Sequence, residues 1–153
     1  MTKARLFALL VLLVAFTFVP ASAADPPGEK SMQKVLGIGG LFFRSEDPGQ
    51  LAKWYEAHLG ISPVPTSYEQ QPWQQEAGHT VFAPFKKDTE YFGRPGQGWM
   101  VNFRVADLDA MVDQLRAAGI QVSDPESHPN GDFARLYDPE GNPIELWEPR
   151  DPG

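Results

Sequence analysis

Two stretches of the chain repeat one order of apolar and polar positions. Leu41–Asp47 alternates in the manner of a strand, and the residues that follow, up to Ile61, have apolar side chains at helical spacing. Val101–Asp107 and the residues up to Ile120 repeat this order about 60 residues later. The repetition predicts a domain of two similar halves, each opening with a strand and then a helix.

The two predicted helices have clear signals at both ends. Asp47 and Asp107 are suited to cap the helix starts, and Pro48 fits the first helical position. Gly60 and Gly119 fit the left-handed position that follows a helix. The faces of the two helices carry Leu51, Trp54, Tyr55 and Leu59 in the first, and Leu108, Met111, Val112 and Leu115 in the second. Apolar faces of this width indicate contact with a core rather than with a ligand.

Further strands are expected after each helix. Ser67–Gln75 is a weak strand pattern and His79–Phe85 a better one. After the second helix, Asp132–Tyr137 and Ile144–Trp147 have strand patterns, and Asp138–Gly141 has the composition of a type I turn between them. Each half is therefore interpreted as a βαβββ module.

Two such modules predict an α+β fold. Their sheets would lie side by side as one curved mixed sheet, with a cup inside and the helices outside. The predicted modules cover about residues 35–88 and 97–149, within a domain at 35–149. Thr89–Gly98 joins them, and its glycines fit either a plain linker or a movable rim over the cup.

The N-terminal residues have the pattern of a secretory signal peptide. Lys3 and Arg5 precede an apolar run from Leu6 to Val19, and Ala21-Ser22-Ala23 then supplies small residues at the expected cleavage site. We therefore expect residues 1–23 to be a signal peptide and 24–34 a flexible leader. The mature domain would be exported, to the periplasm or the extracellular space.

Charge and cysteine content narrow the expected partners. Without Lys3 and Arg5 the chain has 11 basic and 20 acidic residues, so its net charge becomes 11 − 20 = −9. An acidic chain is a poor partner for nucleic acid or for an anionic membrane surface. The sequence has no cysteine, which excludes disulfides and thiolate metal ligands. We expect a small-molecule ligand, no nucleic acid, and no membrane contact after signal cleavage.

The order of these motifs resembles the vicinal-oxygen-chelate superfamily, which includes glyoxalase I, bleomycin-resistance proteins and extradiol dioxygenases. The run from Asp138 to Leu146 looks like the family's terminal hairpin, and Asp47–Ile61 looks like its first helix. The resemblance covers about residues 35–149. It implies the glyoxalase/bleomycin-resistance/dioxygenase fold and, by analogy with the bleomycin-resistance proteins, a homodimer.

In metal-dependent members of this superfamily, four inward-facing side chains hold a divalent ion. The resemblance places the last of these ligands at Glu145, but two others fall at Gly40 and Met100. Glycine has no side chain to offer, and a thioether is a poor ligand for a hard divalent ion. His79 is the residue near the remaining position that could bind a metal. A divalent metal ion is therefore a possible cofactor, with Glu145 and His79 as an incomplete ligand set.

Strand alternation gives the other side chains expected to line the cup. These candidate substrate-binding residues are Phe42, Arg44, Asn102, Arg104 and Trp147. Arg44 and Arg104 occupy equivalent places in the repeat, and arginine recognises carboxylates and phosphates through paired hydrogen bonds. Alternatively, both arginines pair with nearby acids such as Glu145 and serve the fold alone.

Two functions remain open from the sequence. One is a glyoxalase-like protein that binds a small molecule in its cup without a full metal site. The other is a metal-dependent lyase, isomerase or dioxygenase-type enzyme, similar to lactoylglutathione lyase, in which Glu145 is a metal ligand or a catalytic base.

Overall fold

The computed structural model describes residues 33–150 of the chain. The predicted signal peptide, residues 1–23, and most of the predicted leader lie outside the described residues. The chain divides into two compact units, residues 1–40 and 41–153. In the first unit, the described residues 33–40 contain no helix or strand. All elements discussed below belong to the second unit.

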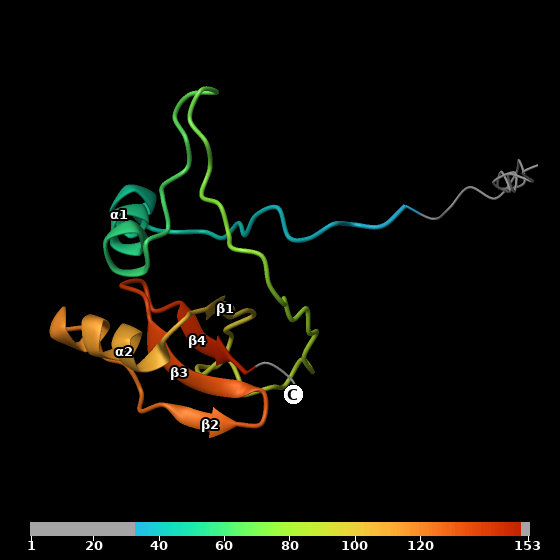
Figure 1. Ribbon diagram of the computed structural model, residues 1–153, viewed down its shortest axis with the longest axis vertical. Coiled ribbons are helices and arrows are strands. Elements are labelled where there is room, and N and C mark those ends of the chain that lie inside the picture. Colours follow the sequence, from blue (N-terminus) through green and yellow to red (C-terminus); the bar gives the residue numbers. More distant parts are fainter. Residues whose placement is uncertain (1–32, 151–153) are drawn as a thin grey trace, which may run out of the picture. The chain divides into compact units, whose positions relative to one another are not determined.

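Two helices form where the sequence predicts them (Figure 1). Helix α1 is Pro48–Leu59, and α2 is Leu108–Ala117. The Asp47 side chain accepts a hydrogen bond of 3.0 Å from the amide of Gln50, and Gly60 ends α1 with φ = +68°. Because glycine adopts this left-handed conformation without a steric cost, the helix ends there. Neither helix in the described part of the chain has the length and hydrophobicity required to span a membrane.

A mixed sheet of four strands lies in the C-terminal half. The strands are β1 (Val101–Arg104), β2 (Glu126–His128), β3 (Gly131–Tyr137) and β4 (Pro143–Pro149). They are arranged in the order β1-β4-β3-β2, with β1 parallel to β4 and the other pairs antiparallel. With α2 between β1 and β2, this half is a complete βαβββ module, as predicted. The α+β class and the mixed sheet are confirmed.

The strands predicted for the first half are not formed in the described residues. Leu41–Asp47, Ser67–Gln75 and His79–Phe85 all lie outside the strands, so these assignments were wrong. An alternating pattern gives a strand only where a neighbouring strand supplies hydrogen bonds. These segments have no such neighbour, and Phe42 and Phe82 are about nine-tenths exposed. Of the first predicted module, the structure therefore contains the helix but not the sheet.

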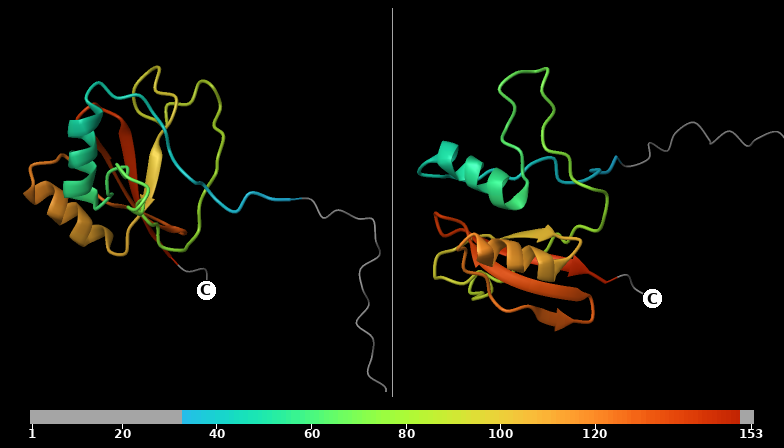
Figure 2. Two further views of the ribbon diagram at one scale, coloured as in Figure 1. Left: turned by 90° about the horizontal axis from the view of Figure 1, so that it is seen from above. Right: turned by 60° about the vertical axis from the view of Figure 1, so that its left-hand side comes forward.

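Both helices pack on one face of the sheet (Figure 2). Their buried side chains join those of β3 and β4 in a single core, which comprises Leu51, Tyr55, Leu108, Val112, Leu115, Ala134, Leu136, Ile144 and Leu146. The alternation of side chains along a strand places every second residue of β3 and β4 in this core. The residues between them must face the opposite side, away from the helices.

The turn between β3 and β4 fastens α1 to the sheet. Buried Asp138 accepts a hydrogen bond of 3.0 Å from the Tyr55 hydroxyl and others from amides within its own turn. Glu140 accepts hydrogen bonds from the Ser45 hydroxyl at 2.7 Å and from the Asp47 amide at 3.0 Å. The predicted terminal hairpin is thus an anchor for the start of the first helix.

These contacts shift the pKa values of two groups in opposite directions. Burial, followed by the charge of Asp138, raises the pKa of the Tyr55 hydroxyl. The hydrogen bond from the Asp47 amide, followed by that from Ser45, lowers the pKa of the Glu140 carboxyl. Both shifts keep each group in the protonation state that its hydrogen bonds require.

Replacement of a core side chain on β4 tests the position of the core. Leu146 is fully buried, so Leu146→Ala should lower the free energy of unfolding by about 2–5 kcal/mol. The matched control is Val64→Ala, because Val64 is 85% exposed and its truncation should change stability by less than about 0.5 kcal/mol. Urea denaturation measures both variants. An equal loss of unfolding free energy in the two variants would contradict the burial of Leu146 in the core.

The hairpin anchor should weaken in acid. Since the folded pKa of Glu140 lies below its unfolded value, its stabilising contribution is present at neutral pH and disappears as the pH falls through the folded pKa. The Glu140→Gln variant should therefore be less stable than the wild type at pH 7, and the difference should shrink below about pH 4. Unfolding at several pH values measures this. Glu56→Gln, at an exposed position of α1, serves as the control. If the stability difference between the wild type and Glu140→Gln did not depend on pH, the charge of Glu140 would not be involved in the anchor.

Candidate functional site

The face of the sheet opposite the helices carries two rows of side chains. The strand register aligns Asn102 with Glu145 and Glu145 with Arg135, which forms the first row. It also aligns Arg104 with Trp147 and Trp147 with Phe133, which forms the second row. Asn102, Arg104, Glu145 and Trp147 were predicted to share a face, and the pairing register agrees with that prediction. We call this surface the polar face.

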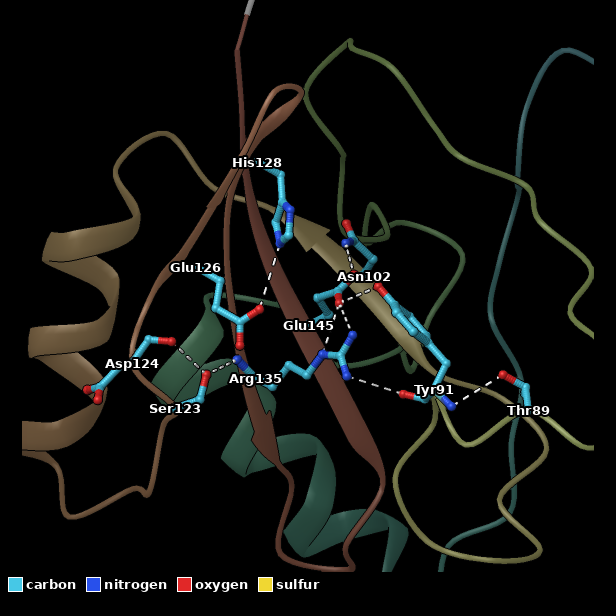
Figure 3. Close-up of polar contacts among 9 residues, drawn as sticks. All are labelled: Thr89, Tyr91, Asn102, Ser123, Asp124, Glu126, His128, Arg135 and Glu145. Atoms are coloured by element: carbon cyan, nitrogen blue, oxygen red, sulfur yellow. Dashed lines mark hydrogen bonds and ion pairs between the residues drawn. The ribbon is translucent and has the colours of Figure 1, made fainter.

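Glu145 lies at the centre of the first row and is buried (Figure 3). Its Oε1 atom accepts hydrogen bonds from the Tyr91 hydroxyl at 2.8 Å and from the Arg135 Nη2 atom at 2.9 Å. Arg135 Nε donates a further bond of 3.1 Å to the same oxygen. The Oε2 atom accepts from the Asn102 amide at 2.8 Å. The carboxylate is therefore paired with one charge and hydrogen-bonded at both oxygens.

Tyr91 brings the loop between the two halves onto the polar face. The Arg135 guanidinium lies 4.2 Å from the centre of the Tyr91 ring, a distance typical of a cation–π contact. Burial, followed by the hydrogen bond to Glu145, raises the pKa of the Tyr91 hydroxyl. The hydroxyl therefore keeps its proton and acts as the donor to Glu145. Arg94 holds the same loop at the hairpin, through a hydrogen bond of 2.6 Å to the Gly141 carbonyl.

Arg135 and Tyr91 were not among the predicted site residues. The signal for Arg135 is present in the sequence, since a tight turn at Asp138–Gly141 fixes the register of the strands on either side. That register places Arg135 opposite Glu145. The contact of Tyr91 spans 54 positions in the chain and has no local signal in the sequence.

Arg104 in the second row contacts backbone rather than an acid. Its Nη2 atom donates to the Glu76 carbonyl at 2.7 Å, and its Nη1 atom donates to the Ala77 carbonyl at 3.3 Å. A side chain at Gly78 would overlap with the guanidinium, so the backbone at this position lies directly against Arg104. Residues 76–78 thus cover this part of the polar face.

Two aromatic rings continue the second row. The rings of Trp147 and Phe133 are nearly parallel, at 5° to each other, with their centres 6.0 Å apart. The Trp147 indole N–H donates to the Asn130 carbonyl at 3.0 Å, which fixes the orientation of the ring. Trp147 is buried and Phe133 is partly exposed. The polar face therefore combines a cation with an apolar surface.

The remaining predicted site residues are not brought to this cluster. Arg44 and His79 are exposed and lie outside the strands, as does Phe42. Met100 is partly buried and lines a shallow surface depression together with Tyr91 and other residues. A ligand role for Phe42, Arg44 and His79 stays a prediction.

The glyoxalase-like domain family matches residues 40–147, more than two thirds of the chain. The chain belongs to this family. The match confirms the resemblance to the vicinal-oxygen-chelate superfamily. No curated protein matches the chain.

Several solved structures are similar to this glyoxalase-like chain. A glyoxalase/bleomycin resistance protein from Streptomyces sp. CB03234 is 33% identical over 35% of this chain and 48% of its own, with a TM-score of 0.32. An antibiotic-binding protein from Streptomyces sp. CB03234 is 24% identical over 69% and 88%, with a TM-score of 0.45. A lactoylglutathione lyase from Agrobacterium tumefaciens is 21% identical over 68% and 87%, also at 0.45. The matched part thus spans about half of the first of these proteins, and the family assignment rests on the domain match.

The family's divalent metal does not fit the side chains of this glyoxalase-like domain. The Glu145 carboxylate is already engaged by Arg135, Tyr91 and Asn102, and a cation would have to displace the guanidinium. Met100 supplies a thioether, which is a poor ligand for hard ions. Within residues 33–150, no group of three or more His, Cys, Asp or Glu side chains could hold a metal ion.

The ion pair between Arg135 and Glu145 can be tested by removing one partner or both. Arg135→Met leaves a buried carboxylate without its counter-ion and should cost about 2–4 kcal/mol of stability. The cost is below that of a fully buried pair because the Arg135 side chain is 44% exposed. In the double variant Arg135→Met/Glu145→Leu, no charge is left unpaired, so most of the stability should return. Urea unfolding of the four proteins in this cycle provides the measurement. Additive losses would contradict the pairing.

Proposed function

We propose that this chain is an exported small-molecule-binding protein that uses the polar face of its glyoxalase-like domain without a metal ion. The observation that carries the proposal is the state of Glu145. This residue stands where the family's last metal ligand is expected, but its carboxylate is neutralised by Arg135 and hydrogen-bonded by Tyr91 and Asn102. A carboxylate in this state serves to hold Arg135 and the Tyr91 loop in place.

The rest of the polar face supports ligand binding. Small-molecule sites combine apolar walls with a few oriented polar groups. Here Phe133 and Trp147 supply the aromatic surface, and Arg104 and Asn102 supply hydrogen-bond donors.

Export and assembly complete the proposal. Export is supported by the signal-peptide pattern of residues 1–23. The homodimer expected from the resemblance to bleomycin-resistance proteins stays a prediction.

The proposal predicts different thermal responses to metals and to organic ligands. A ligand that binds the folded state but not the unfolded chain raises Tm, and the rise grows with the ratio of its concentration to its Kd. Zn²⁺, Mn²⁺ or Ni²⁺ should leave Tm unchanged, and elemental analysis should find less than about a tenth of an ion per chain after reconstitution. At least one member of a metabolite and antibiotic library should raise Tm.

The control is Glu145→Gln, measured with the same metals. If the wild type bound metal stoichiometrically and this variant did not, Glu145 would be a metal ligand. That outcome would overturn the proposal of a metal-free site. A library in which no compound raises Tm would contradict ligand binding.

A further inference from the structure

The Arg104 guanidinium has no acidic partner among the described residues. The ion pairs of residues 33–150 involve Arg116, His128, Arg135 and Arg150. Arg104 donates instead to two backbone carbonyls, those of Glu76 and Ala77. Hydrogen bonds from a guanidinium to a carboxylate are stronger than those to neutral carbonyls, and they are often bidentate. A partly buried arginine held by neutral acceptors can therefore exchange them for an anion.

The two carbonyls belong to a segment that can be displaced at low cost. Residues 76–78 lie outside any helix or strand, and all three are exposed. Their backbone oxygens bind two neighbouring nitrogens of one guanidinium, as the two oxygens of a carboxylate would. Gly78 permits the close approach, because a Cβ at this position would overlap with the guanidinium.

The neighbours of Arg104 in the second row define the rest of the ligand. Trp147 is aligned with Arg104 on the adjacent strand, and Phe133 is aligned with Trp147 on the next. Adjacent strands are about 4.8 Å apart, so Phe133 is about 10 Å from Arg104 across the sheet. The partly exposed Phe133 ring, backed by the parallel Trp147 ring, offers a flat apolar surface at that distance. A bicyclic aromatic acid has this length.

We propose that the polar face binds a planar aromatic carboxylate, and that residues 76–78 cover the anion position until this ligand arrives. The carboxylate forms two hydrogen bonds with Arg104 in place of the Glu76 and Ala77 carbonyls. The aromatic ring packs beside Phe133. This inference rests on the proposed function and adds the chemical class of the ligand. It also adds that residues 76–78 compete with the ligand for Arg104.

A matched pair of probes tests the charge requirement. The full chain is titrated with 2-naphthoate and with its neutral analogue 2-naphthamide, and heats of binding are measured. The naphthoate should bind at least about tenfold more tightly, as expected for a charge-assisted bidentate pair. Arg104→Gln should reduce this preference to about twofold or less. The control Lys53→Gln, which removes an exposed charge from α1, should retain it.

Gly78→Ala tests the cover. The added methyl group cannot coexist with the observed position of Arg104, so either the guanidinium or residues 76–78 must move and their contact should be broken. The affinity for 2-naphthoate should then rise about threefold or more, because the competing carbonyls are gone, while that for 2-naphthamide should stay the same. Circular dichroism checks that the variant is folded. A lower affinity for 2-naphthoate would overturn the cover, since the segment would then be positioning Arg104 for the ligand.

The outcomes separate this inference from the proposed function. Equal binding of the two probes would overturn the anion requirement while leaving a small-molecule site on the polar face. If neither probe bound but other library compounds raised Tm, the aromatic-acid class would be wrong and the proposed function would stand. If neither probe bound and no library compound raised Tm, both would fail.

Discussion

The pairing of β4 with both β1 and β3 is the constraint on which the domain depends. This last strand joins a parallel partner about 40 residues away to an antiparallel partner that directly precedes it. Its side chains alternate between the two faces, so Ile144 and Leu146 enter the core while Glu145 and Trp147 enter the polar face. A shift of register by one residue would exchange these sets. The same hydrogen bonds therefore fix both the core and the site.

The burial of Glu145 imposes the second requirement. A buried carboxylate needs a counter-charge and hydrogen-bond donors. In a metal-binding relative of this fold an ion can supply the charge, whereas here Arg135 supplies it from the neighbouring strand. Tyr91 completes the hydrogen bonding and attaches the loop between the halves to the sheet. The ion pair thus satisfies the buried carboxylate at the centre of the polar face and ties β3 to β4 there.

Local signals in the sequence were sufficient to predict the helices and the terminal hairpin. The pairing of strands that are far apart in the chain could not be predicted from them. The caps at Asp47 and Gly60 act within one turn, and the structure shows both. The similar patterns of Leu41–Asp47 and Val101–Asp107 have different outcomes: Val101–Arg104 pairs with β4, whereas Leu41–Asp47 has no strand partner among the described residues. The alternation of side chains along β4 puts Glu145 on the face opposite Ile144 and Leu146, as predicted, and the hairpin register places Arg135 beside it. No local pattern reveals Tyr91, since its contact depends on the path of the whole loop.

The two arginines of the polar face differ in what their charge can do. Arg135 is neutralised by Glu145, so the pair contributes little to the electrostatic potential of its surroundings. Arg104 lacks such a partner among residues 33–150 and is a local cation on a chain whose net charge is −7. At physiological ionic strength, charges beyond about 8 Å are largely screened, so the acidic remainder of the surface does little to repel an anion that has reached Arg104. The electrostatic potential near Arg104 is therefore set by its own charge rather than by the net charge of the whole protein.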